Sequence, residues 1–585
     1  MQIIASPTEI MASAIRSCRK HFLAVVTFSA LLNLLFLVPM LYMLQIYDRV
    51  IPTRGYLTLF FLTLVLLFGL STLALLDFVR SRLLVRASIR LDRELAGLLL
   101  DTALARRDGT FDAVTRQAMR EFDTLRQTLT GPAVIALCDA PWSPIYVLVC
   151  LVIHPLIGLL VLGGGVVLGM VAWRNQLATG EPMQRASEAA ARAYASQEQV
   201  LAGAENVRAL GMRQAMVRRH LAERNSMISQ QSSASFSANS YVTASKFLRL
   251  SLQSLALGLG AWLAIGNSIS AGAVFASSFM AGRALQPIEQ LLASWRSIAQ
   301  ARTAYEKMNS LLASREAEIA LTQLPPPEGR LDVDQMSVAN ATGDGAVLAN
   351  ISFQVLPGEV VAVIGPSGAG KSTLLRMLSG AGRPDRGTIR VDRANVLDWD
   401  PEQLGVYIGF LPQDVSLFAG TVKENIARFQ DGACGIQGDI DAKSIRAARA
   451  CFAHDMILGL PNGYDSMLGW GGRGLSAGQA QRIGLARALY GDPPIILLDE
   501  PNAHLDPAGE GHLLETLAAL KARKAAVMVV AHRMGVLSAV DKIMVLREGR
   551  IEAFGSRDEI IAALTKAPAA PIEAPKKVAR RRQRA

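Results

Sequence analysis

Six long apolar stretches in the first half of the chain limit its possible folds more than any other feature. A helix rises about 1.5 Å per residue, so roughly 20 apolar residues suffice to cross the hydrocarbon core of a bilayer. The sequence therefore predicts six membrane-spanning helices. The sixth is the weakest, because it contains Arg283, Gln286 and Glu289. The stretches cover residues 22–44, 57–76, 133–153, 156–173, 247–265 and 272–292.

The positions of basic residues orient these stretches in the membrane. Arginines and lysines precede the first stretch and follow the second and the fourth, beginning at Arg80 and Arg174. Because basic residues are enriched in cytoplasmic loops, we expect both termini in the cytoplasm, with two long cytoplasmic excursions at about residues 80–130 and 174–246. Glycine and proline are scarce in these excursions, so we expect the spanning helices to continue through them.

The composition agrees with a membrane protein. The mean hydropathy is +0.28, and 51% of the residues are hydrophobic. The net charge of +11 lies largely beside the apolar stretches and in the C-terminal tail, where contact with cytoplasm and anionic lipid explains it. We therefore expect a lipid bilayer as a partner and no nucleic acid. The five cysteines form no C-x-x-C pair, which disfavours a zinc site or a disulfide framework.

A glycine-rich loop dominates the second half. The apolar run Val360-Val-Ala-Val-Ile364 precedes it and an apolar helical pattern follows, which is the context that a phosphate-binding loop requires. The backbone N–H groups of such a loop point inward, and the helix after it contributes a positive end. Lys371 would contact the β- and γ-phosphates, and the Ser372 hydroxyl would bind Mg²⁺. The loop consists of Gly365, Pro366, Ser367, Gly368, Ala369, Gly370, Lys371, Ser372 and Thr373.

A second apolar run ends in two acidic residues. Residues 495–498 are all isoleucine or leucine, and Asp499 and Glu500 follow directly. A continuous apolar run of this length is typical of a buried strand, which would deliver both carboxylates to its carboxyl end. One carboxylate can then hold Mg²⁺ while the other polarises an attacking water.

Between these motifs, Gly474-Leu-Ser-Ala-Gly-Gln479 resembles the signature sequence of ABC-transporter ATPase domains. Gln413 resembles the glutamine of the Q-loop of that family, residues 502–506 its D-loop, and His532 its switch histidine. The order and spacing of all these motifs agree with the family. Six spans ahead of one ATPase domain resemble the half-transporter layout of ABC exporters.

This resemblance predicts the division of the chain. We expect a membrane α-helical bundle with long cytoplasmic extensions, fused to an α/β P-loop nucleotide-binding domain. The expected parts are an N-terminal cytoplasmic segment at 1–21, the transmembrane domain at 22–320, a proline-rich linker at 321–330, the ATPase domain at 331–564, and a basic, disordered tail at 565–585.

The resemblance also implies a role for each motif residue, with ATP and Mg²⁺ as cofactors. Glu500 would be the general base, His532 would contact the γ-phosphate, and Asp506 would belong to the D-loop. Mg²⁺ would be held by Ser372, Gln413 and Asp499. The signature residues would bind the γ-phosphate held by the other subunit of a homodimer; they are Ser476, Ala477, Gly478 and Gln479.

Three segments of the predicted membrane half indicate which branch of the ABC exporters the chain resembles. Residues 39–50, 139–145 and 282–290 are similar to segments of type I secretion permease/ATPases of the protease/lipase (PrtD-type) branch. That branch implies the bacterial inner membrane, a periplasmic membrane-fusion adaptor and a TolC-like outer-membrane channel. The cargo would be an unfolded polypeptide with a C-terminal secretion signal, such as a protease, a lipase or a glycine-repeat protein. We expect no leader cleavage, because residues 1–21 are too few for a peptidase domain.

Some points stay open at this stage. An exporter of lipid or small amphiphilic molecules could share the scaffold. Arg283 and Glu289 could line a substrate path or pair structurally, and Asp139 with its neighbouring prolines could produce a kink or line a pathway. Two positions depart from the family pattern: Ala477 replaces a glycine of the signature, and Asn340 stands where an aromatic residue often stacks on adenine.

Overall fold

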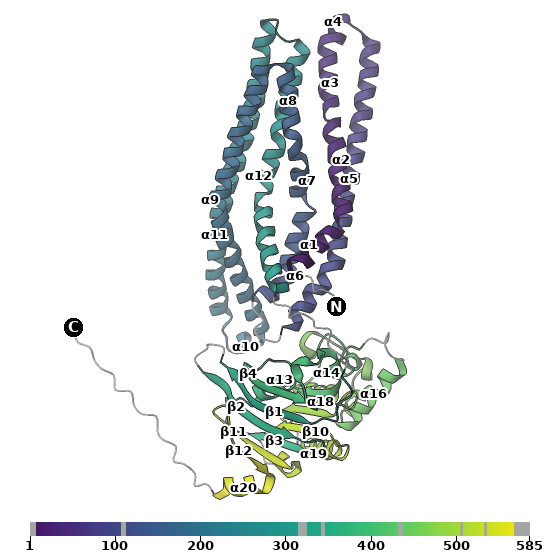
Figure 1. Cartoon of the computed structure of the whole chain (residues 1–585), viewed down its shortest axis with the longest axis vertical. Coiled ribbons are helices and arrows are strands. Elements are labelled where there is room, and N and C mark those ends of the chain that lie inside the picture. The colour runs from purple at the N-terminus through teal and green to yellow at the C-terminus, as the bar shows by residue number, and fades with distance from the viewer. Residues whose placement is uncertain are drawn as a thin grey trace, which may run out of the picture. The chain divides into compact units, whose positions relative to one another are not determined.

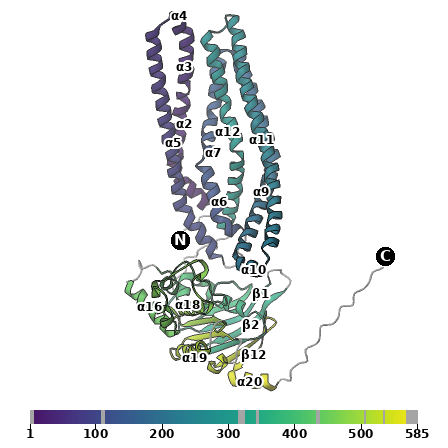
Figure 2. The same cartoon turned by 180° about the vertical axis from the view of Figure 1, so that it is seen from behind.

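The computed structural model describes residues 7–106, 113–313, 324–340, 345–430, 437–503, 507–531 and 535–566 (Figures 1 and 2). The chain divides into two compact units. The first combines Met1–Arg106 with Thr110–Glu318, and the second combines Arg107–Gly109 with Ile319–Ala585.

The first unit is entirely helical in its described part. Its three longest helices, α5, α9 and α11, have 50, 48 and 53 residues, as expected if spanning helices continue beyond the bilayer. The elements are α1 (Pro7–Ser17), α2 (Arg19–Leu35), α3 (Leu37–Gln45), the π-helix η1 (Ile46–Val50), α4 (Ile51–Thr53), α5 (Tyr56–Ala105), α6 (Ala113–Leu129), α7 (Pro132–Asp139), the 3-10 turn η2 (Ala140–Trp142), α8 (Ser143–Ile153), α9 (Pro155–Ala202), α10 (Ala204–Ala209), α11 (Arg213–Ile265) and α12 (Ala271–Ala313).

Five helical segments of the described chain are long and apolar enough to cross a membrane. They contain the first five predicted stretches. The sixth stretch lies in α12, a helix of 43 residues that carries Arg283 and Glu289 within the predicted span. These charges lower its apolarity, so its membrane placement stays a prediction. The five segments are Arg19–Thr53, Tyr56–Ala105, Gln117–Ile153, Pro155–Ala202 and Arg213–Ile265.

Helices α9 and α11 lie side by side along the unit, and α12 packs against both (Figures 1 and 2). Gly164 of α9 faces Leu252 of α11, where a Cβ atom would collide with the leucine side chain. Close packing therefore explains this glycine of the Gly163–Gly165 run. Gly163 and Gly169 have no described neighbour within 4 Å of a Cβ position, so they do not make such a contact.

The segment around Asp139 forms a break between two helices. Helix α7 ends at Asp139, the 3-10 turn Ala140–Trp142 follows, and α8 begins at Ser143. Pro141 lies within the turn and Pro144 at the start of α8, where the missing N–H of proline leaves no helical hydrogen bond unmade. Of the two roles that the sequence leaves open for this segment, the break in the helix is present, and the Asp139 carboxylate accepts hydrogen bonds from Asn33 of α2 and Arg80 of α5.

The second unit is an α/β domain built on three sheets. The largest has the strand order β12-β11-β3-β10-β9-β6, and a four-stranded antiparallel sheet has the order β2-β1-β4-β5. The strands are β1 (Leu331–Ala339), β2 (Ala346–Val355), β3 (Val360–Ile364), β4 (Arg386–Val391), β5 (Ala394–Asn395), β6 (Ile408–Leu411), β7 (Gly420–Thr421), β8 (Met467–Leu468), β9 (Ile495–Asp499), β10 (Ala526–Val530), β11 (Lys542–Arg547) and β12 (Arg550–Ser556).

Helices cover both faces of the large sheet, whose side chains alternate between two hydrophobic cores. Val360 and Ala362 of β3 belong to one core, and Val361 and Val363 belong to the other. Every residue of β9 and β10 is buried, as continuous apolar runs of parallel strands require. The helices are α13 (Lys371–Leu378), α14 (Pro401–Tyr407), α15 (Val422–Ile426), α16 (Gln437–Ala450), α17 (His454–Leu458), α18 (Ala477–Leu489), α19 (Pro507–Ala522) and α20 (Arg557–Lys566).

In the helical unit, Asp48 of η1 closes the N-terminus of α12. Its carboxylate accepts hydrogen bonds from the Ser270 hydroxyl at 2.5 Å and from the Gly272 N–H at 2.7 Å. Ser270 in turn accepts from the Ala273 N–H at 3.2 Å. A Cβ on Gly272 would lie 2.6 Å from the Leu44 carbonyl oxygen, so the close approach requires glycine here.

We predict that Asp48→Ala destabilises the helical unit by about 1 kcal/mol, because two donors at the α12 N-terminus lose their acceptor. Thermal unfolding of the detergent-purified protein measures the effect. Asp48→Asn keeps one acceptor oxygen and should lose less. Equal unfolding temperatures for Asp48→Ala and the unmodified chain would contradict this capping role.

Candidate functional site

The motif residues gather at one edge of the large sheet. Strands β3, β6, β9 and β10 are parallel, and their register aligns Val363 with Val530, Asp499 with Val530, and Leu411 with Leu498. Their carboxyl ends therefore meet. The glycine-rich loop follows β3, Gln413 follows β6, and the Asp499–Glu500 pair ends β9, so this sheet edge brings all three motifs together.

Positive backbone angles shape the glycine-rich loop. Gly368 and Gly370 have φ values of 80° and 98°, a region that favours glycine. A Cβ on Gly370 would lie 2.7 Å from Leu348 Cδ2 and 3.0 Å from the Val347 carbonyl oxygen of β2. The loop leads directly into α13, whose first residue is Lys371. The free backbone N–H groups at the start of α13 are suited to bind an anion.

Lys371 is the buried cation of the loop. The residue is only 6% exposed. Its Nζ donates to the carbonyl oxygens of Gly365 and Pro366, both at 2.9 Å. These bonds hold the ammonium group over the loop interior. Ser372 beside it is exposed, so its hydroxyl is accessible to a ligand.

The two carboxylates at the end of β9 differ in environment. Asp499 is 2% exposed, whereas Glu500 is half-buried. Glu500 has a φ of 50°, a left-handed conformation that non-glycine residues adopt at an energetic cost and that is concentrated at functional sites. The Gln481 side-chain amide of α18 donates to its carbonyl oxygen at 3.4 Å. The backbone therefore turns at Glu500, directly after β9 ends at Asp499.

The signature helix begins with a reciprocal cap. Ser476 Oγ accepts from the Gln479 N–H at 3.3 Å, and Gln479 Oε1 accepts from the Ser476 N–H at 2.9 Å. Together they form a capping box at the start of α18. Ser476 and Ala477 are exposed, while Gly478 and Gln479 are half-buried. This end of α18 can therefore receive an anion from outside the chain.

Helix α18 is tied to the segment that follows Gln413. A Cβ on Gly484 would lie 2.7 Å from Val415 Cγ1, and Arg487 Nη1 donates to the Ser416 carbonyl at 2.9 Å. Arg428 donates in turn to the Arg487 carbonyl oxygen at 3.1 Å. Burial and, to a smaller extent, the charge of Arg487 outweigh the opposite effect of Tyr490 and lower the pKa of Arg428 to about 10, so Arg428 stays protonated near neutral pH. A displacement of the Gln413 segment would therefore act on the signature helix.

Two candidate residues lie outside the described residues, namely Asp506 and His532. The strand before His532 is described up to Ala531, whose N–H donates to the Val363 carbonyl at 3.2 Å. Within the described residues, no group of three or more histidine, cysteine or acidic side chains forms a metal site. The oxygen donors expected for Mg²⁺ are instead a hydroxyl, an amide and a carboxylate, which are the hard ligands this ion prefers.

Arg283 and Glu289, the two candidates for a substrate path, have different surroundings in the structure. Arg283 lines a cavity of about 160 Å³ within the helical unit, together with Asp139. Glu289 is not among the residues that line this cavity, and it forms an ion pair with Arg249 of α11. The structure thus favours structural pairing for Glu289 and a cavity position for Arg283.

Sequence reasoning missed the role of Arg80. We counted it among the basic residues that flank the second span, where it would be solvated. The structure buries it to 8% exposure between helices, where it pairs with Asp77 and Asp139. Its position one turn after Asp77 in an apolar helix was a usable signal, because residues three apart on a helix are neighbours.

Comparison with known proteins identifies relatives of the whole chain. Residues 348–503 match the family described as ABC transporter, and residues 22–284 match the ABC transporter transmembrane region. The chain is 38% identical to the type I secretion system ATP-binding protein PrsD of Rhizobium meliloti, over 94% of each chain.

More distant relatives and a solved structure agree. Identity is 29% to the cyclolysin secretion/processing ATP-binding protein CyaB of Bordetella pertussis, over 96% of this chain and 79% of the relative. It is also 29% to the leukotoxin export ATP-binding protein LtxB of Aggregatibacter actinomycetemcomitans, over 94% and 77%. A bacterial Atm1-family ABC exporter with ATP bound has the same fold, with a TM-score of 0.80, 22% identity, and coverage of 94% of this chain and 99% of that one.

We predict that Lys371→Ala lowers ATP hydrolysis by about 10²-fold or more, because the γ-phosphate loses a buried cation. A phosphate-release assay on the purified protein measures the rate. Lys521→Ala is a matched control, since it removes a half-exposed lysine of α19 that pairs with Asp541. Hydrolysis at the unmodified rate in Lys371→Ala would remove this lysine from its role.

Asn340 generates a second prediction. It directly follows β1, is exposed, and its N–H donates to the Gly345 carbonyl at 2.7 Å. The partner strand β2 passes beside Gly370, which places this hairpin near the loop.

Without an aromatic ring at position 340 to stack on adenine, GTP should compete with ATP better than in an exporter that carries such a ring. Asn340→Tyr should tighten nucleotide binding by about tenfold. Titration with a fluorescent ATP analogue, with GTP as competitor, tests both statements, and unchanged affinity in Asn340→Tyr would refute the second.

Proposed function

The chain belongs to the ABC transporters and, among them, to the type I secretion system ATP-binding proteins, and from this premise we propose that it is the ATP-driven exporter of a polypeptide. It hydrolyses ATP and is a multi-pass protein of the inner membrane. The observation that carries the proposal is the meeting of the phosphate loop, Gln413 and the Asp499–Glu500 pair at one sheet edge. That arrangement supports hydrolysis in a chain whose other half is a membrane bundle.

In the proposed cycle, each nucleotide lies between two copies of the chain. Lys371 and the loop N–H groups of one copy hold the phosphates, and the capped start of α18 in the other copy binds the γ-phosphate. The exposure of Ser476 and Ala477 in the single chain supports this role. Glu500 accepts a proton from the attacking water, His532 contacts the γ-phosphate, and Asp506 belongs to the D-loop. Hydrolysis then separates the two copies.

Mg²⁺ fits the donor set of this site. Ser372, Gln413 and Asp499 would hold it through a hydroxyl, an amide oxygen and a carboxylate, and the ion supplies neutralisation of the phosphate charge. Gln413 also connects the site to α18 through the segment that carries Ser416. The binding of a nucleotide can therefore change the position of the signature helix.

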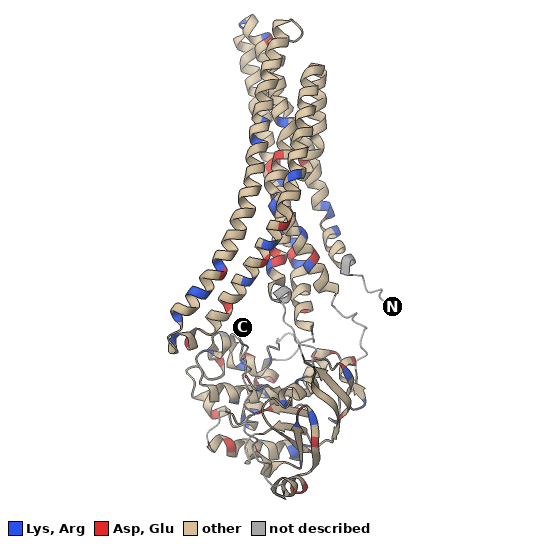
Figure 3. Cartoon of the chain, turned by 90° about the vertical axis from the view of Figure 1, so that its left-hand side faces the viewer, with Lys and Arg blue, Asp and Glu red and all other residues tan. Residues whose placement is uncertain are grey.

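The proposed topology places the ATPase domain and both termini in the cytoplasm. Lys, Arg, Asp and Glu positions are denser toward the end of the helical unit where α6 and α10 lie, as expected for helices that leave the bilayer on that side (Figure 3). We assign the transmembrane domain to residues 22–320, the linker to 321–330 and the ATPase domain to 331–564. The family matches at 22–284 and 348–503 lie inside these bounds.

The proposed partners are those that the resemblance to type I secretion permease/ATPases implies. The chain would work as a homodimer with a periplasmic membrane-fusion adaptor and a TolC-like outer-membrane channel, and its cargo would carry a C-terminal secretion signal. Relatives named for the secretion of cyclolysin and the export of leukotoxin support a secreted cargo. Export of lipid or small amphiphiles, the alternative left open by the sequence, is not favoured by these relatives.

A secretion assay tests the proposed function. Cells that express this chain with its adaptor and outer-membrane channel should release a reporter that carries the C-terminal segment of a candidate cargo, and Lys371→Ala should abolish the release. A reporter without the C-terminal segment is the control. Retention of the tagged reporter in the cells, with all three components present in the membranes, would contradict polypeptide export.

We further predict that Glu500→Gln binds ATP normally but hydrolyses it at least about 10²-fold more slowly, because the amide cannot accept the proton of the attacking water. The ATP-bound form should accumulate as a closed dimer, measured by cross-linking across the two ATPase domains. Glu510→Gln, on α19 of the same domain, is the control substitution. Wild-type turnover in Glu500→Gln would assign the base to another residue.

A further inference from the structure

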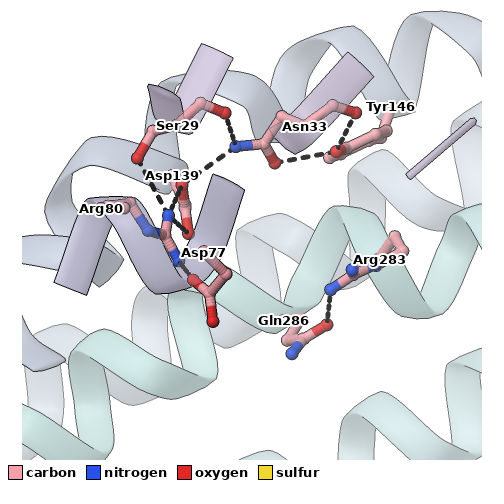
Figure 4. A network of polar contacts seen from close by, with 8 residues as sticks. All are labelled: Ser29, Asn33, Asp77, Arg80, Asp139, Tyr146, Arg283 and Gln286. Atoms are coloured by element: carbon pink, nitrogen blue, oxygen red, sulfur yellow. Dashed lines mark hydrogen bonds and ion pairs between the residues drawn. The ribbon is translucent and has the colours of Figure 1, made fainter. Parts of the chain in front are cut away.

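The cavity in the helical unit is lined by a network of hydrogen-bonded polar side chains and by the cationic side chain of Arg283, which lies apart from that network (Figure 4). Its volume of about 160 Å³ resembles that of engineered cavities of about 150 Å³ that hold a benzene molecule. Helices α2, α5, α7, α8 and α12 contribute to it. It is therefore large enough for a side chain or a chain end of a passing polypeptide.

The network forms a bonded wall centred on Arg80. Its Nη2 donates to Asp77 at 2.7 Å, and its Nη1 donates to the Ser29 hydroxyl at 3.0 Å and to Asp139 at 3.2 Å. Asn33 donates to the same Asp139 carboxylate at 2.9 Å. Both carboxylates of this wall are thus already engaged with donors of the protein.

Asn33 extends the bonded wall to a further helix. The single hydroxyl proton of Tyr146 is shared between the Asn33 side-chain oxygen, at 2.8 Å, and the Asn33 backbone carbonyl oxygen, at 2.9 Å. The wall therefore joins α2, α5, α7 and α8 through direct contacts. Because its polar atoms are held by one another, it offers a ligand few free donors.

Arg283 of α12 is different. Among the described residues, its recorded contacts are a hydrogen bond to Gln286 at 2.6 Å and the face of the Phe36 ring, 3.1 Å from the guanidinium carbon to the ring centre. Neither partner is a carboxylate. A guanidinium has five N–H donors, so most of them remain for a ligand. The Asp139 carboxylate attracts Arg283 through space, but its direct ion pair is with Arg80. A charge at membrane depth without a direct ion pair is expensive to maintain, which makes Arg283 a candidate for binding.

From these contacts we infer that Arg283 is a carboxylate-binding site for the polypeptide in transit, an inference that rests on the proposed function. A planar carboxylate matches the fork of a guanidinium and binds it through two parallel hydrogen bonds. Two sources share this chemistry: an acidic side chain within the cargo and the free carboxylate at its C-terminus. Asp77, whose side chain is 51% exposed, carries a negative charge on the bonded wall and opposes the bound anion.

Three acetylated glycine–serine peptides test the site. One carries a single glutamate and an amidated C-terminus, the second carries glutamine and a free C-terminus, and the third carries glutamine and an amidated C-terminus. Each is added to the full-length protein in lipid nanodiscs, and two quantities are measured: peptide affinity, and protection of Arg283 from phenylglyoxal, followed by mass spectrometry. At least one carboxylate peptide should protect Arg283 more than the third does. The peptide that protects identifies the source.

Variants sharpen the result. Arg283→Gln should lower the affinity for the peptide that protects Arg283 by about tenfold. Arg283→Lys should lower this affinity less, because lysine keeps the positive charge but not the planar fork of N–H donors. Asp77→Asn should strengthen binding, since it removes the opposing charge; a cavity selective for cations would show the reverse. The double variant Arg249→Gln with Glu289→Gln, which replaces an ion pair between α11 and α12 outside the cavity lining, should keep the affinity.

Equal protection by all three peptides, or protection by none, would overturn the inference. If Arg283→Gln does not fold, two results still test the inference: the protection of Arg283 in the unmodified protein, and whether Asp77→Asn raises or lowers the affinity for the peptide. The secretion assay is scored separately. If the reporter is secreted but no peptide protects Arg283 selectively, only the carboxylate-binding site is contradicted. If a peptide protects Arg283 selectively but the reporter is not secreted, the exporter function is contradicted and Arg283 is an anion-binding site with another role.

Discussion

Parallel pairing of β10 with β3 on one side and β9 on the other is the interaction on which the nucleotide site depends. Val530 is aligned with both Val363 and Asp499, so the phosphate loop and the acidic pair start from the same level of the sheet. Burial of every residue in β9 and β10 fixes this register, because a shift of one residue would exchange the side chains between the two cores. The hydrophobic cores thus set the geometry of the charged site.

The same dependence extends to the signature helix. Gly484 allows α18 to approach Val415 closely, and Arg487 bonds to the backbone at Ser416. Arg428 then holds the Arg487 carbonyl from a buried position. A helix attached at these points moves with the segment that carries Gln413. A ligand can shift an equilibrium only through contacts that differ between states, and these bonds are contacts through which bound nucleotide could reposition the surface offered to a second copy.

Much of this organisation was predictable from the sequence. The family, the fold class and ATP-driven export are confirmed by the relatives, because motifs such as the glycine-rich loop are local and keep a fixed order. The capping box of Ser476 and Gln479 also follows a local pattern. The roles of individual site residues stay predictions. What could not be predicted depends on contacts between distant segments: the pairing of Arg80 with Asp139, the pairing of Glu289 with Arg249, and the cap that Asp48 forms on α12.

Arg80 and Arg283 show why an arginine in an apolar helix cannot be interpreted from its own helix alone. Arg80 lies just beyond the second predicted span and Arg283 within the sixth, and both line one cavity. The pair of Arg80 with Asp139 is buried, and removing one partner of such a pair typically destabilises a protein by about 3–5 kcal/mol, whereas the half-exposed Asp77 contributes less. Arg80 is therefore a structural part of the wall. Arg283 bonds to a neutral amide and an aromatic ring, so a carboxylate that reaches it replaces no ionic partner among the described residues. The difference lies in the neighbouring helices, which only the three-dimensional structure brings together.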